Sequence, residues 1–424
     1  MHVVVIGNGA AGVSAVFRIR KHHPDWQISM ISGESKFHYS RPALMYIYMG
    51  HMRYRDTKPY EDDTWAKKNI TLVRDWVTNI DTNNRTLTLH KNKAIKFDRL
   101  IISTGSKPNK FGWPGQDLKG VQGLWGLYDL KNLKENAERA KKAVIVGGGL
   151  IGIELAEMLH SQGVHVVFLV REKSYWSSIL PAEESQLVNE VIREEGIELR
   201  LGTELKEILD DGQGRVSGIV TTNGEQIDCQ VVGLTAGVSP NIDMIKDTDI
   251  ATGRGILVNQ QLQTSDENVW AAGDCAEIVT PGDGRNTINQ VWYTAKMQGE
   301  VVGDNVSDIS RNYAPPLWYN SAKFFDLEYH TYGQVNIDRN AERYLVWQHP
   351  SEKKLIRIVH NKTNEVIGIQ TMGIRFRHRV CEQWINDQRS PEFVLKHLEE
   401  ANFDPEFYQR HENEIRAAFE GVIS

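Results

Sequence analysis

The sequence has 424 residues, which at about 150 residues per domain predicts about three domains. It carries 49 Lys and Arg against 55 Asp and Glu, a formal net charge of −6, so it lacks the basic excess of a nucleic-acid-binding protein. No apolar stretch reaches the length of about 18 residues that a membrane span needs. Three scattered cysteines, Cys229, Cys275 and Cys381, argue against a disulfide scaffold and a zinc knuckle.

The N-terminus begins with a strand-like run. Met1 is followed almost at once by the apolar residues 3–6, which leaves no space for a charged leader and a cleavage site. Together with the sparse cysteines, this pattern predicts a cytoplasmic protein.

The first motif is this β-branched run, which leads into the sequence Gly-x-Gly-x-x-Gly and then a helical pattern. A second apolar run at residues 27–32 completes a strand–helix–strand unit. Glycines in this context let a backbone approach a pyrophosphate, whose negative charge the helix N-terminus favours. The motif therefore predicts a dinucleotide site formed by Gly7, Gly9, Ala10, Ala11 and Gly12.

An acidic residue follows where such units usually bind a ribose. Glu34 lies about 20 residues after Gly12, and a carboxylate there accepts hydrogen bonds from ribose hydroxyls. The alternative is a solvated turn carboxylate. We expect Glu34 to bind the ribose.

The same pattern returns in the middle of the chain. The apolar residues 143–146 lead into a second glycine motif, and another apolar run follows at residues 165–170. Two such units predict an α/β fold with two Rossmann-like domains. The second dinucleotide site is predicted at Gly147, Gly149, Leu150, Ile151 and Gly152.

The residues after this second run affect the choice between NAD and NADP. An acid there bonds the 2′-hydroxyl of NAD, whereas an arginine pairs with the 2′-phosphate of NADP. Val170 occupies the position expected for the acid, and Arg171 and Glu172 follow. Arg171 favours NADPH slightly. The alternative is a charged loop that contacts neither sugar.

Turn residues predict the domain boundaries. Residues 105–109 and 237–241 predict irregular connections on either side of the second core, and residues 312–316 mark a further change. The predicted domains are a discontinuous dinucleotide-binding domain at 1–110 and 240–312, a second one at 111–239, and a C-terminal domain at 313–424.

The C-terminal domain is predicted to be α+β. Helices are expected to begin at Ser390-Pro391 and Asp404-Pro405, where an N-cap residue precedes a proline. Before them, strand-like runs are found at residues 328–333, 344–348, 355–360 and 366–371.

Four further segments complete a resemblance to a known family. They are the sequences YSRPAL at 39–44, DRLIISTGS at 98–106, VWAAGDCA at 269–276 and NSAKFFDL at 320–327. With the two glycine motifs, they make the chain resemble the FAD-dependent pyridine nucleotide–disulfide oxidoreductase family. Within it, the chain is most similar to the NADH oxidase, ferredoxin reductase and nitrite reductase flavoprotein branch. The resemblance covers roughly residues 1–335.

The resemblance implies two cofactors. FAD would bind the first core together with residues after about 240, and NADH or NADPH would bind the second core. Asp274 would bond the pyrophosphate–ribityl region of FAD. A helix over residues 292–305 would point its N-terminus at flavin N1 and O2, where the dipole stabilises negative charge. The other implied cofactor contacts are Arg41, Pro42, Thr104, Gly105, Gly237 and Gly273.

The resemblance also implies catalytic residues. Glu154 matches the family's glutamate near flavin N5, which often pairs with a lysine, but Tyr46 stands where we would place that lysine. A buried carboxylate without a partner is unfavourable, so we hypothesise that Arg41 or Lys323 supplies the charge. The predicted catalytic residues are Glu154 and Arg41.

The position of the cysteines separates this chain from the disulfide reductases of the family. Those enzymes carry a redox cysteine early in the chain, whereas no cysteine here precedes Cys229. Cys275 is expected to be a small buried residue. We therefore expect an FAD-dependent NAD(P)H oxidoreductase that passes electrons directly to a ferredoxin- or rubredoxin-type carrier or to dioxygen. The alternative is a redox-sensing flavoprotein, similar to apoptosis-inducing factor, that forms a long-lived reduced flavin–NAD complex.

The remaining expectations concern partners. Residues 375–379 form a basic cluster, which we expect to be a solvated strand edge, and the alternative is a surface that steers an acidic electron carrier. The 14 histidines show no metal-ligand spacing, so no metal is expected. The resemblance implies that the C-terminal domain is an interface for a homodimer.

Overall fold

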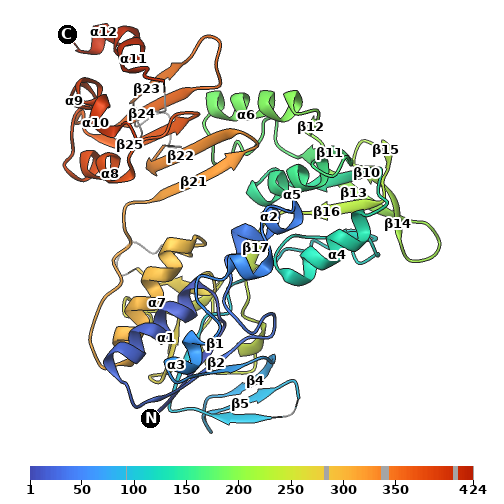
Figure 1. Ribbon diagram of the computed structural model, residues 1–424, viewed down its shortest axis with the longest axis vertical. Coiled ribbons are helices and arrows are strands. Elements are labelled where there is room, and N and C mark those ends of the chain that lie inside the picture. Colours follow the sequence, from blue (N-terminus) through green and yellow to red (C-terminus); the bar gives the residue numbers. More distant parts are fainter. Residues whose placement is uncertain (92, 281–285, 336–342, 404–408, 424) are drawn as a thin grey trace. The chain divides into compact units, whose positions relative to one another are not determined.

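The structure is a computed structural model that describes residues 1–91, 93–280, 286–335, 343–403 and 409–423 (Figure 1). The chain forms two compact units, each assembled from separate stretches. Unit 1 comprises Met1–Phe111, Gln122–Glu138 and Ala236–Pro315. Unit 2 comprises Gly112–Val121, Arg139–Thr235 and Pro316–Ser424.

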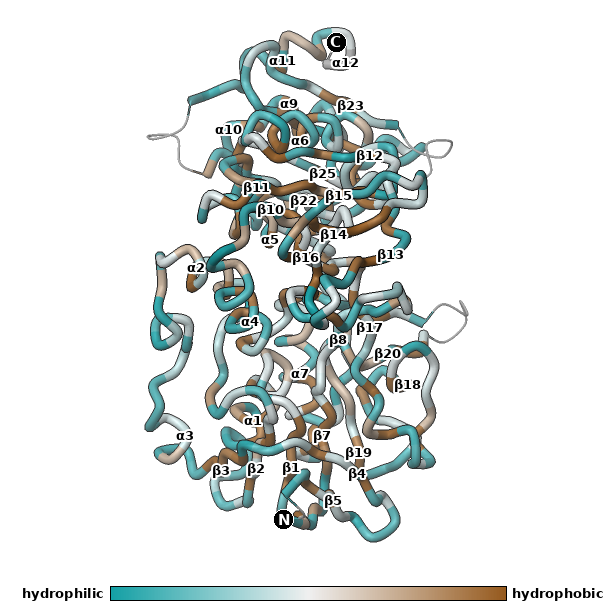
Figure 2. Tube along the Cα trace, turned by 90° about the vertical axis from the view of Figure 1, so that its right-hand side faces the viewer, coloured by the Kyte–Doolittle hydropathy of each residue, from teal (hydrophilic) through white to brown (hydrophobic). Residues whose placement is uncertain are grey.

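The core of unit 1 is a five-stranded sheet with the order β19-β7-β1-β2-β3, in which every pairing is parallel. In its register, Val5 lies between Ile101 and Met30. Strands of a parallel sheet are covered on both faces, so their buried residues form apolar runs, as the last three residues of β7 do in the largely hydrophobic strand of Figure 2. The strands are β1 (His2–Ile6), β2 (Gln27–Ile31), β3 (Ile70–Val73), β7 (Arg99–Ile102) and β19 (Val269–Ala271).

Two long helices of unit 1 lie side by side, α1 (Ala10–His22) and α7 (Trp292–Val306) (Figure 1). Glycines permit the close contact, since a Cβ on Gly299 would lie 2.2 Å from the carbonyl oxygen of Ala11. The prediction of a helix over residues 292–305 is confirmed.

Smaller elements complete unit 1. An antiparallel sheet has the order β4-β5-β6, and β18 pairs with β20 in parallel. These strands are β4 (Val77–Asp81), β5 (Thr86–Leu89), β6 (Ala94–Lys96), β18 (Ile256–Val258) and β20 (Ala276–Ile278). The short helices are α2 (Leu44–Tyr48), α3 (Thr64–Lys67), α4 (Leu127–Ala137) and the 3-10 turns η1 (Arg41–Ala43), η2 (Tyr54–Thr57) and η3 (Asp243–Ile245).

The prediction of irregular connections at 105–109 and 237–241 is wrong in part. These segments contain β8 (Ser106–Pro108) and β17 (Val238–Pro240), which pair with each other in antiparallel orientation. Each connection supplies the hydrogen-bond partners of the other, a relation that their Gly and Pro content does not reveal.

Unit 1 also contains residues 122–138, which fall within the predicted second dinucleotide-binding domain at 111–239. Hydrogen bonds attach this stretch to the N-terminal core. The Leu127 amide donates to Oε1 of Glu34 at 3.0 Å, and Nη1 of Arg41 donates to the Trp125 carbonyl at 2.5 Å. The boundary therefore follows tertiary contacts that lie far apart in sequence.

Unit 2 contains the second parallel core, a five-stranded sheet with the order β12-β11-β10-β16-β9. Its central strands are again hydrophobic, as Figure 2 shows for β11. The strands are β9 (Val121–Gln122), β10 (Lys142–Val146), β11 (His165–Val170), β12 (Glu198–Leu201) and β16 (Val231–Leu234), and the helices are α5 (Leu150–His160) and α6 (Ala182–Glu194). An antiparallel sheet is formed by β13 (Leu205–Asp210), β14 (Val216–Thr221) and β15 (Gln226–Asp228).

The C-terminal sheet also belongs to unit 2 and is antiparallel, with the order β21-β22-β25-β24-β23. The four predicted strands of this region are confirmed to within one residue. The strands are β21 (Tyr319–Phe324), β22 (Leu327–Gly333), β23 (Arg343–Gln348), β24 (Leu355–His360) and β25 (Val366–Met372). The helices are α8 (His378–Asn386), α9 (Pro391–Lys396), α10 (Leu398–Ala401), α11 (Glu412–Ala418) and α12 (Glu420–Ile423).

The predicted helix start at Ser390-Pro391 is confirmed, because Oγ of Ser390 accepts a hydrogen bond from the Phe393 amide at 3.3 Å. The predicted start at Asp404-Pro405 lies outside the described residues. The expected fold class, two Rossmann-like cores with an α+β C-terminal part, is confirmed. No helix in the described part of the chain is long and apolar enough to cross a membrane.

Candidate functional site

The first glycine loop, between β1 and α1, combines tight packing with open space. Gly7 has φ +106°, and a Cβ there would lie 2.1 Å from the Ser103 carbonyl oxygen. A Cβ on Gly12 would lie 2.2 Å from the carbonyl oxygen of Gly7. A Cβ on Gly9, in contrast, would meet nothing within 4 Å. Protein packing therefore explains Gly7 and Gly12, whereas Gly9 leaves room for a ligand.

The helix that follows this loop offers free backbone donors. Helix α1 starts at Ala10 and Ala11, its N-cap residue is Gly9, no side chain caps it, and its first turn holds no acidic residue. The first amides of a helix have no partner within the helix and carry the positive end of its dipole. An anionic group such as a pyrophosphate fits this position.

Two predicted site residues, Glu34 and Arg41, meet directly. Oε2 of Glu34 accepts a hydrogen bond from Nη2 of Arg41 at 2.5 Å. Oε1 of Glu34 accepts one from the Leu127 amide at 3.0 Å and another from the Tyr39 hydroxyl. Burial raises the pKa of Tyr39 well above its usual value, so this phenol keeps its proton and donates. Arg41 thus holds the Glu34 carboxylate, and Pro42 follows it in the turn η1.

The segment VWAAGDCA at residues 269–276 lies beside the first glycine loop. A Cβ on Gly273 would lie 3.2 Å from Cβ of Ala11, at the start of α1. The next residue, Asp274, accepts a hydrogen bond from Oγ of Ser106 at 2.8 Å, and Ser106 accepts one from Nε2 of Gln290 at 3.1 Å. Burial raises the pKa of Asp274. The N-terminal glycine loop and the segment at 269–276 therefore lie next to each other in unit 1.

Three other predicted contacts belong to the paired connections β8 and β17. Oγ1 of Thr104 donates to the Asn241 carbonyl at 2.6 Å, and the Asn241 amide donates to the Gly105 carbonyl at 2.8 Å. The Gly237 carbonyl accepts a hydrogen bond from the Asn109 amide at 3.1 Å. These contacts fix the place where the chain leaves and re-enters unit 1.

The second glycine loop, between β10 and α5, repeats the design of the first. Gly147 has φ +119°, and a Cβ on Gly152 would lie 2.3 Å from the Gly147 carbonyl oxygen. A Cβ on Gly149 would meet nothing within 4 Å. Gly149 is the N-cap of α5, whose first residues, Leu150 and Ile151, have no side-chain cap. In both loops, glycines that backbone conformation or packing requires therefore flank an open one.

The end of β11 carries the candidate residues for nucleotide choice. Val170 is fully buried and packs on the glycine loop, since a Cβ on Gly148 would lie 2.8 Å from its Cγ1. The Arg171 side chain is 72% exposed, and its Nη2 lies 3.0 Å from Oε1 of Glu172. The apolar side chain of Val170 therefore occupies the position where an acid would be expected to bond the 2′-hydroxyl of NAD, and the accessible Arg171 follows it.

Glu154 lies on α5 and is partly buried. Among the described residues of unit 2, none forms a hydrogen bond or ion pair with it, and burial together with the nearby Glu157 raises its pKa to about 7. The hypothesised partner Lys323 pairs instead with Asp326 at 3.2 Å. Arg41 pairs with Glu34 in unit 1.

All three cysteines are buried. Burial raises the pKa of Cys229 to about 12, and it also raises the pKa values of Cys275 and Cys381. A thiol needs its thiolate form to react. Burial therefore disfavours the reactive thiolate form of all three cysteines.

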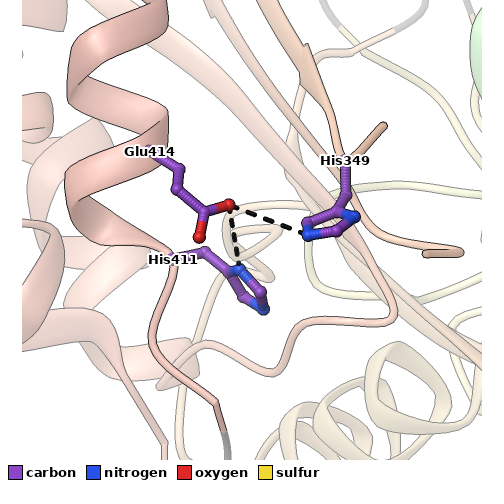
Figure 3. Close-up of side chains that lie close together, drawn as sticks. All are labelled: His349, His411 and Glu414. Carbon is purple, nitrogen blue, oxygen red and sulfur yellow. Dashed lines mark ion pairs between the residues drawn. The ribbon is translucent and has the colours of Figure 1, made fainter. Parts of the chain in front are cut away.

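Two histidines and a glutamate gather in the C-terminal part, His349, His411 and Glu414 (Figure 3). Nδ1 of His349 accepts hydrogen bonds from the amides of residues 351 and 352, and Nε2 of His411 lies 2.8 Å from the Lys354 ammonium. The ring protons therefore sit on the two nitrogens that face Glu414, at 3.8 and 3.5 Å. A metal-binding histidine normally donates its second N–H to an acceptor, whereas the second ring nitrogens of His349 and His411 accept hydrogen bonds here, so the arrangement does not match that of a metal site.

The basic cluster at 375–379 is solvated in part, because Arg377 and Arg379 are exposed. Arg375 pairs with Glu328, with Nε 2.9 Å from Oε2, and Phe376 is buried. Arg377 is the N-cap of α8, which starts at His378. The expectation of a strand edge is wrong in part, because Phe376 forms only an isolated β-bridge with Asn402 and α8 begins two residues later.

Comparison with known proteins agrees with this arrangement. Residues 1–299 match the pyridine nucleotide-disulphide oxidoreductase family. An NADH oxidase of Methanocaldococcus jannaschii is 28% identical over 395 residues, covering 88% of each chain. An NADH-rubredoxin oxidoreductase of Clostridium acetobutylicum is 29% identical over 389 residues, covering 89% of this chain and 94% of that one.

A solved structure supports the fold over nearly the whole chain. The NAD-dependent persulfide reductase from A. fulgidus aligns with a TM-score of 0.83 and 25% identity, covering 93% of this chain and 79% of that one. The family match spans more than half of the sequence and includes both glycine loops. The chain therefore belongs to the pyridine nucleotide-disulphide oxidoreductase family and is an NAD(P)H-dependent flavoprotein oxidoreductase.

Proposed function

We propose that the protein takes reducing equivalents from NAD(P)H onto FAD and passes them to an acceptor without a thiol relay. One observation carries this proposal: the chain keeps two open glycine loops for dinucleotides, yet all three of its cysteines are buried and protonated. The chain therefore carries both glycine motifs of the family, whereas its cysteines are all buried.

The residues of unit 1 fit FAD. The open space at Gly9 and the uncapped start of α1 suit the pyrophosphate, and Glu34, held by Arg41, presents a carboxylate for the ribose. Asp274, oriented by Ser106, suits the ribityl chain. When bound, FAD supplies the redox chemistry by accepting a hydride and releasing electrons, while the protein supplies position and charge.

The residues of unit 2 fit a nicotinamide nucleotide. Gly149 leaves room for its pyrophosphate, and the amides at the start of α5 supply donors. Arg171 is accessible for a 2′-phosphate, and Val170 removes the acid that would select the 2′-hydroxyl. We therefore propose a slight preference for NADPH over NADH.

We further propose that Glu154 acts as a catalytic residue by holding or releasing a proton during the reaction. Its pKa of about 7 is close to physiological pH, so the carboxyl exchanges protons readily under working conditions. The assignment of Glu154 to a place near the flavin rests on its match to the family glutamate near flavin N5.

The proposed acceptor is a small one-electron carrier of the ferredoxin or rubredoxin type, or dioxygen. This choice is supported by the relatives named NADH-rubredoxin oxidoreductase and NADH oxidase. A homodimer through the C-terminal domain is part of the same proposal.

Anaerobic stopped-flow spectroscopy tests the function. We expect the yellow protein to bleach within seconds on mixing with NADH or NADPH and to regain its colour on adding an acceptor. A protein that stays colourless after FAD addition contradicts the proposal. Slow reoxidation with every acceptor, together with a nucleotide-dependent change in size by sedimentation, indicates a redox sensor instead.

Replacing Arg171 tests the nucleotide preference. Arg171→Ala should raise the KM for NADPH about tenfold and change that for NADH little, because a charge-assisted hydrogen bond contributes about 1.5–3 kcal/mol. The exposed Lys173, two residues further on, provides the matched control as Lys173→Ala. Equal losses with both nucleotides would refute the assignment.

A further inference from the structure

The loop between β11 and α6 contains a buried aromatic residue that touches the second glycine loop. The Tyr175 side chain is fully buried, and its hydroxyl donates a hydrogen bond to the carbonyl oxygen of Gly149 at 3.1 Å. Gly149 is the open glycine and the N-cap of α5. Burial keeps the pKa of Tyr175 well above its usual value, so the phenol remains a donor.

This hydrogen bond fixes a backbone donor as well as a carbonyl. The peptide bond is planar and trans, so the direction of the Gly149 C=O sets the opposite direction of the Leu150 N–H. That N–H is at the first position of α5, where the helix itself offers it no partner. The Gly149 carbonyl also accepts hydrogen bonds from the amides of Gly152 and Ile153, at 3.1 and 3.2 Å. Tyr175 thus adds a third constraint from outside the helix.

The backbone of Tyr175 is itself held by α6. Its amide donates to Oδ1 of Asn189 at 3.0 Å, and its carbonyl accepts from Oγ of Ser185 at 2.5 Å. Ser185 and Asn189 are both buried. These contacts leave the phenol little freedom to move away from the glycine loop.

The C-terminal sheet supports the ring. Phe324 on β21 meets Tyr175 edge to face, with the ring centroids 5.9 Å apart and the planes at 80°. The next residue, Trp176, has φ +50°, a conformation that is rare for bulky residues and that persists only when its surroundings enforce it. Its ring contacts Phe324 and Tyr329, with centroid distances of 6.3 and 6.2 Å.

We propose that Tyr175 is a positioning residue for the nicotinamide nucleotide, which aims the Leu150 N–H at the nucleotide pyrophosphate and is itself held in place by Phe324 of the C-terminal sheet. This inference rests on the proposed function, because it takes the loop at 147–152 as the nucleotide site. It also gives the C-terminal part a role in nucleotide binding within its own unit.

Tyr175→Phe tests the inference, because it removes the hydroxyl and keeps the ring. Calorimetric titration with NADP⁺ and with NAD⁺ should show a Kd about fivefold higher than in the wild type, the effect of one hydrogen bond. The KM for NAD(P)H should rise by a similar factor, while kcat at saturation and the FAD absorption spectrum stay unchanged. A purely structural role would not separate KM from kcat in this way.

Tyr332→Phe is the matched control. It removes another buried tyrosine hydroxyl of unit 2 that donates to a backbone carbonyl, that of Phe376 at 3.2 Å. We expect it to leave the nucleotide Kd unchanged. Phe324→Leu keeps the Tyr175 hydroxyl but loosens the ring, and it should raise the Kd about twofold.

The outcomes separate the two proposals. If the wild-type protein binds neither NADP⁺ nor NAD⁺, the proposed function fails and the role of Tyr175 fails with it. If the wild type binds the nucleotides and both Tyr175→Phe and Phe324→Leu bind them as tightly as the wild type does, the positioning role alone is overturned. The same holds if Tyr332→Phe weakens binding as much as Tyr175→Phe does.

Discussion

At the level of single residues, the glycines of the two loops serve two different physical purposes. Gly7 and Gly12 are needed because neighbouring backbone atoms occupy the place of a side chain. Gly9 has an ordinary φ of −73° and open space around it, so nothing in the protein itself demands a glycine there. We therefore propose that the glycine at this position serves the ligand.

Alanine substitutions separate these purposes. Gly9→Ala should leave the melting temperature of the apoprotein unchanged and weaken FAD binding at least about tenfold, because the new methyl group takes space used by the pyrophosphate. Gly12→Ala should lower stability by about 1–3 kcal/mol, since a Cβ 2.2 Å from a backbone oxygen forces a shift. Thermal unfolding and fluorescence titration with FAD measure the two effects. Tight FAD binding by Gly9→Ala would contradict this view of the site.

Glu154 predicts a pH dependence of stability. Its pKa of about 7 in the folded protein lies above its ordinary value of 4.5, so the folded state binds the proton more tightly than the unfolded state. The resulting stabilisation is complete below about pH 4.5 and is lost as the pH rises through about 7. Glu154→Gln has no such titration. Its free energy of unfolding, relative to wild type, should therefore increase by up to about 3 kcal/mol between pH 5 and pH 8 in urea titrations. If the difference in unfolding free energy between Glu154→Gln and the wild type stays constant across this pH range, the Glu154 carboxyl has an ordinary pKa.

At the level of elements, a buried ion pair joins the C-terminal sheet to α6. Arg357 on β24 is 3% exposed and pairs with the fully buried Glu184, with Nε 2.6 Å from Oε1. Nη2 of Arg357 also lies 2.7 Å from Oε2 of Glu183, which is 41% exposed. Because Glu184 adjoins Ser185, this pair and the contacts of Tyr175 fix the same turn of α6.

Removing the arginine should be strongly destabilising. Arg357→Met leaves Glu184 buried without a counter-charge, which typically reduces stability by about 3–5 kcal/mol. Glu183→Gln removes only the half-exposed partner and should reduce it by less than about 1 kcal/mol. Chemical denaturation followed by circular dichroism measures both. Equal small effects would mean that the buried pair contributes little to the packing of α6.

The elements also show where sequence periodicity suffices. Four of the five strands of the C-terminal sheet are predictable because buried strands concentrate β-branched and apolar residues, as in β24 and β25, whereas β21 is not among the predicted strands. The pairing of β8 with β17 is not predictable, because three residues rich in Ser and Pro carry no periodicity of their own. Short strands of this kind form only when another segment supplies the hydrogen bonds.

At the level of the whole molecule, the cysteines bear most directly on the chemistry. All three are buried, and their pKa values are raised by burial. Iodoacetamide should therefore leave the native protein unmodified, and a variant with all three cysteines changed to alanine should reduce the acceptor within about twofold of the wild-type rate. Mass spectrometry and steady-state turnover measure these outcomes. Loss of turnover on alkylation of the native protein would mean that a thiol takes part.

The two Rossmann-like cores are predictable from the sequence alone, because a Gly-x-Gly-x-x-Gly motif between a strand and a helix specifies both backbone shape and local chemistry. The absence of an early cysteine is also evident from the sequence. Only the tertiary structure showed that Arg41 holds Glu34, that residues 122–138 join unit 1, and that Tyr175 reaches Gly149. These relations depend on contacts between segments far apart in the chain. A local pattern specifies how a segment folds, whereas the partner of a side chain depends on which distant segment packs against it.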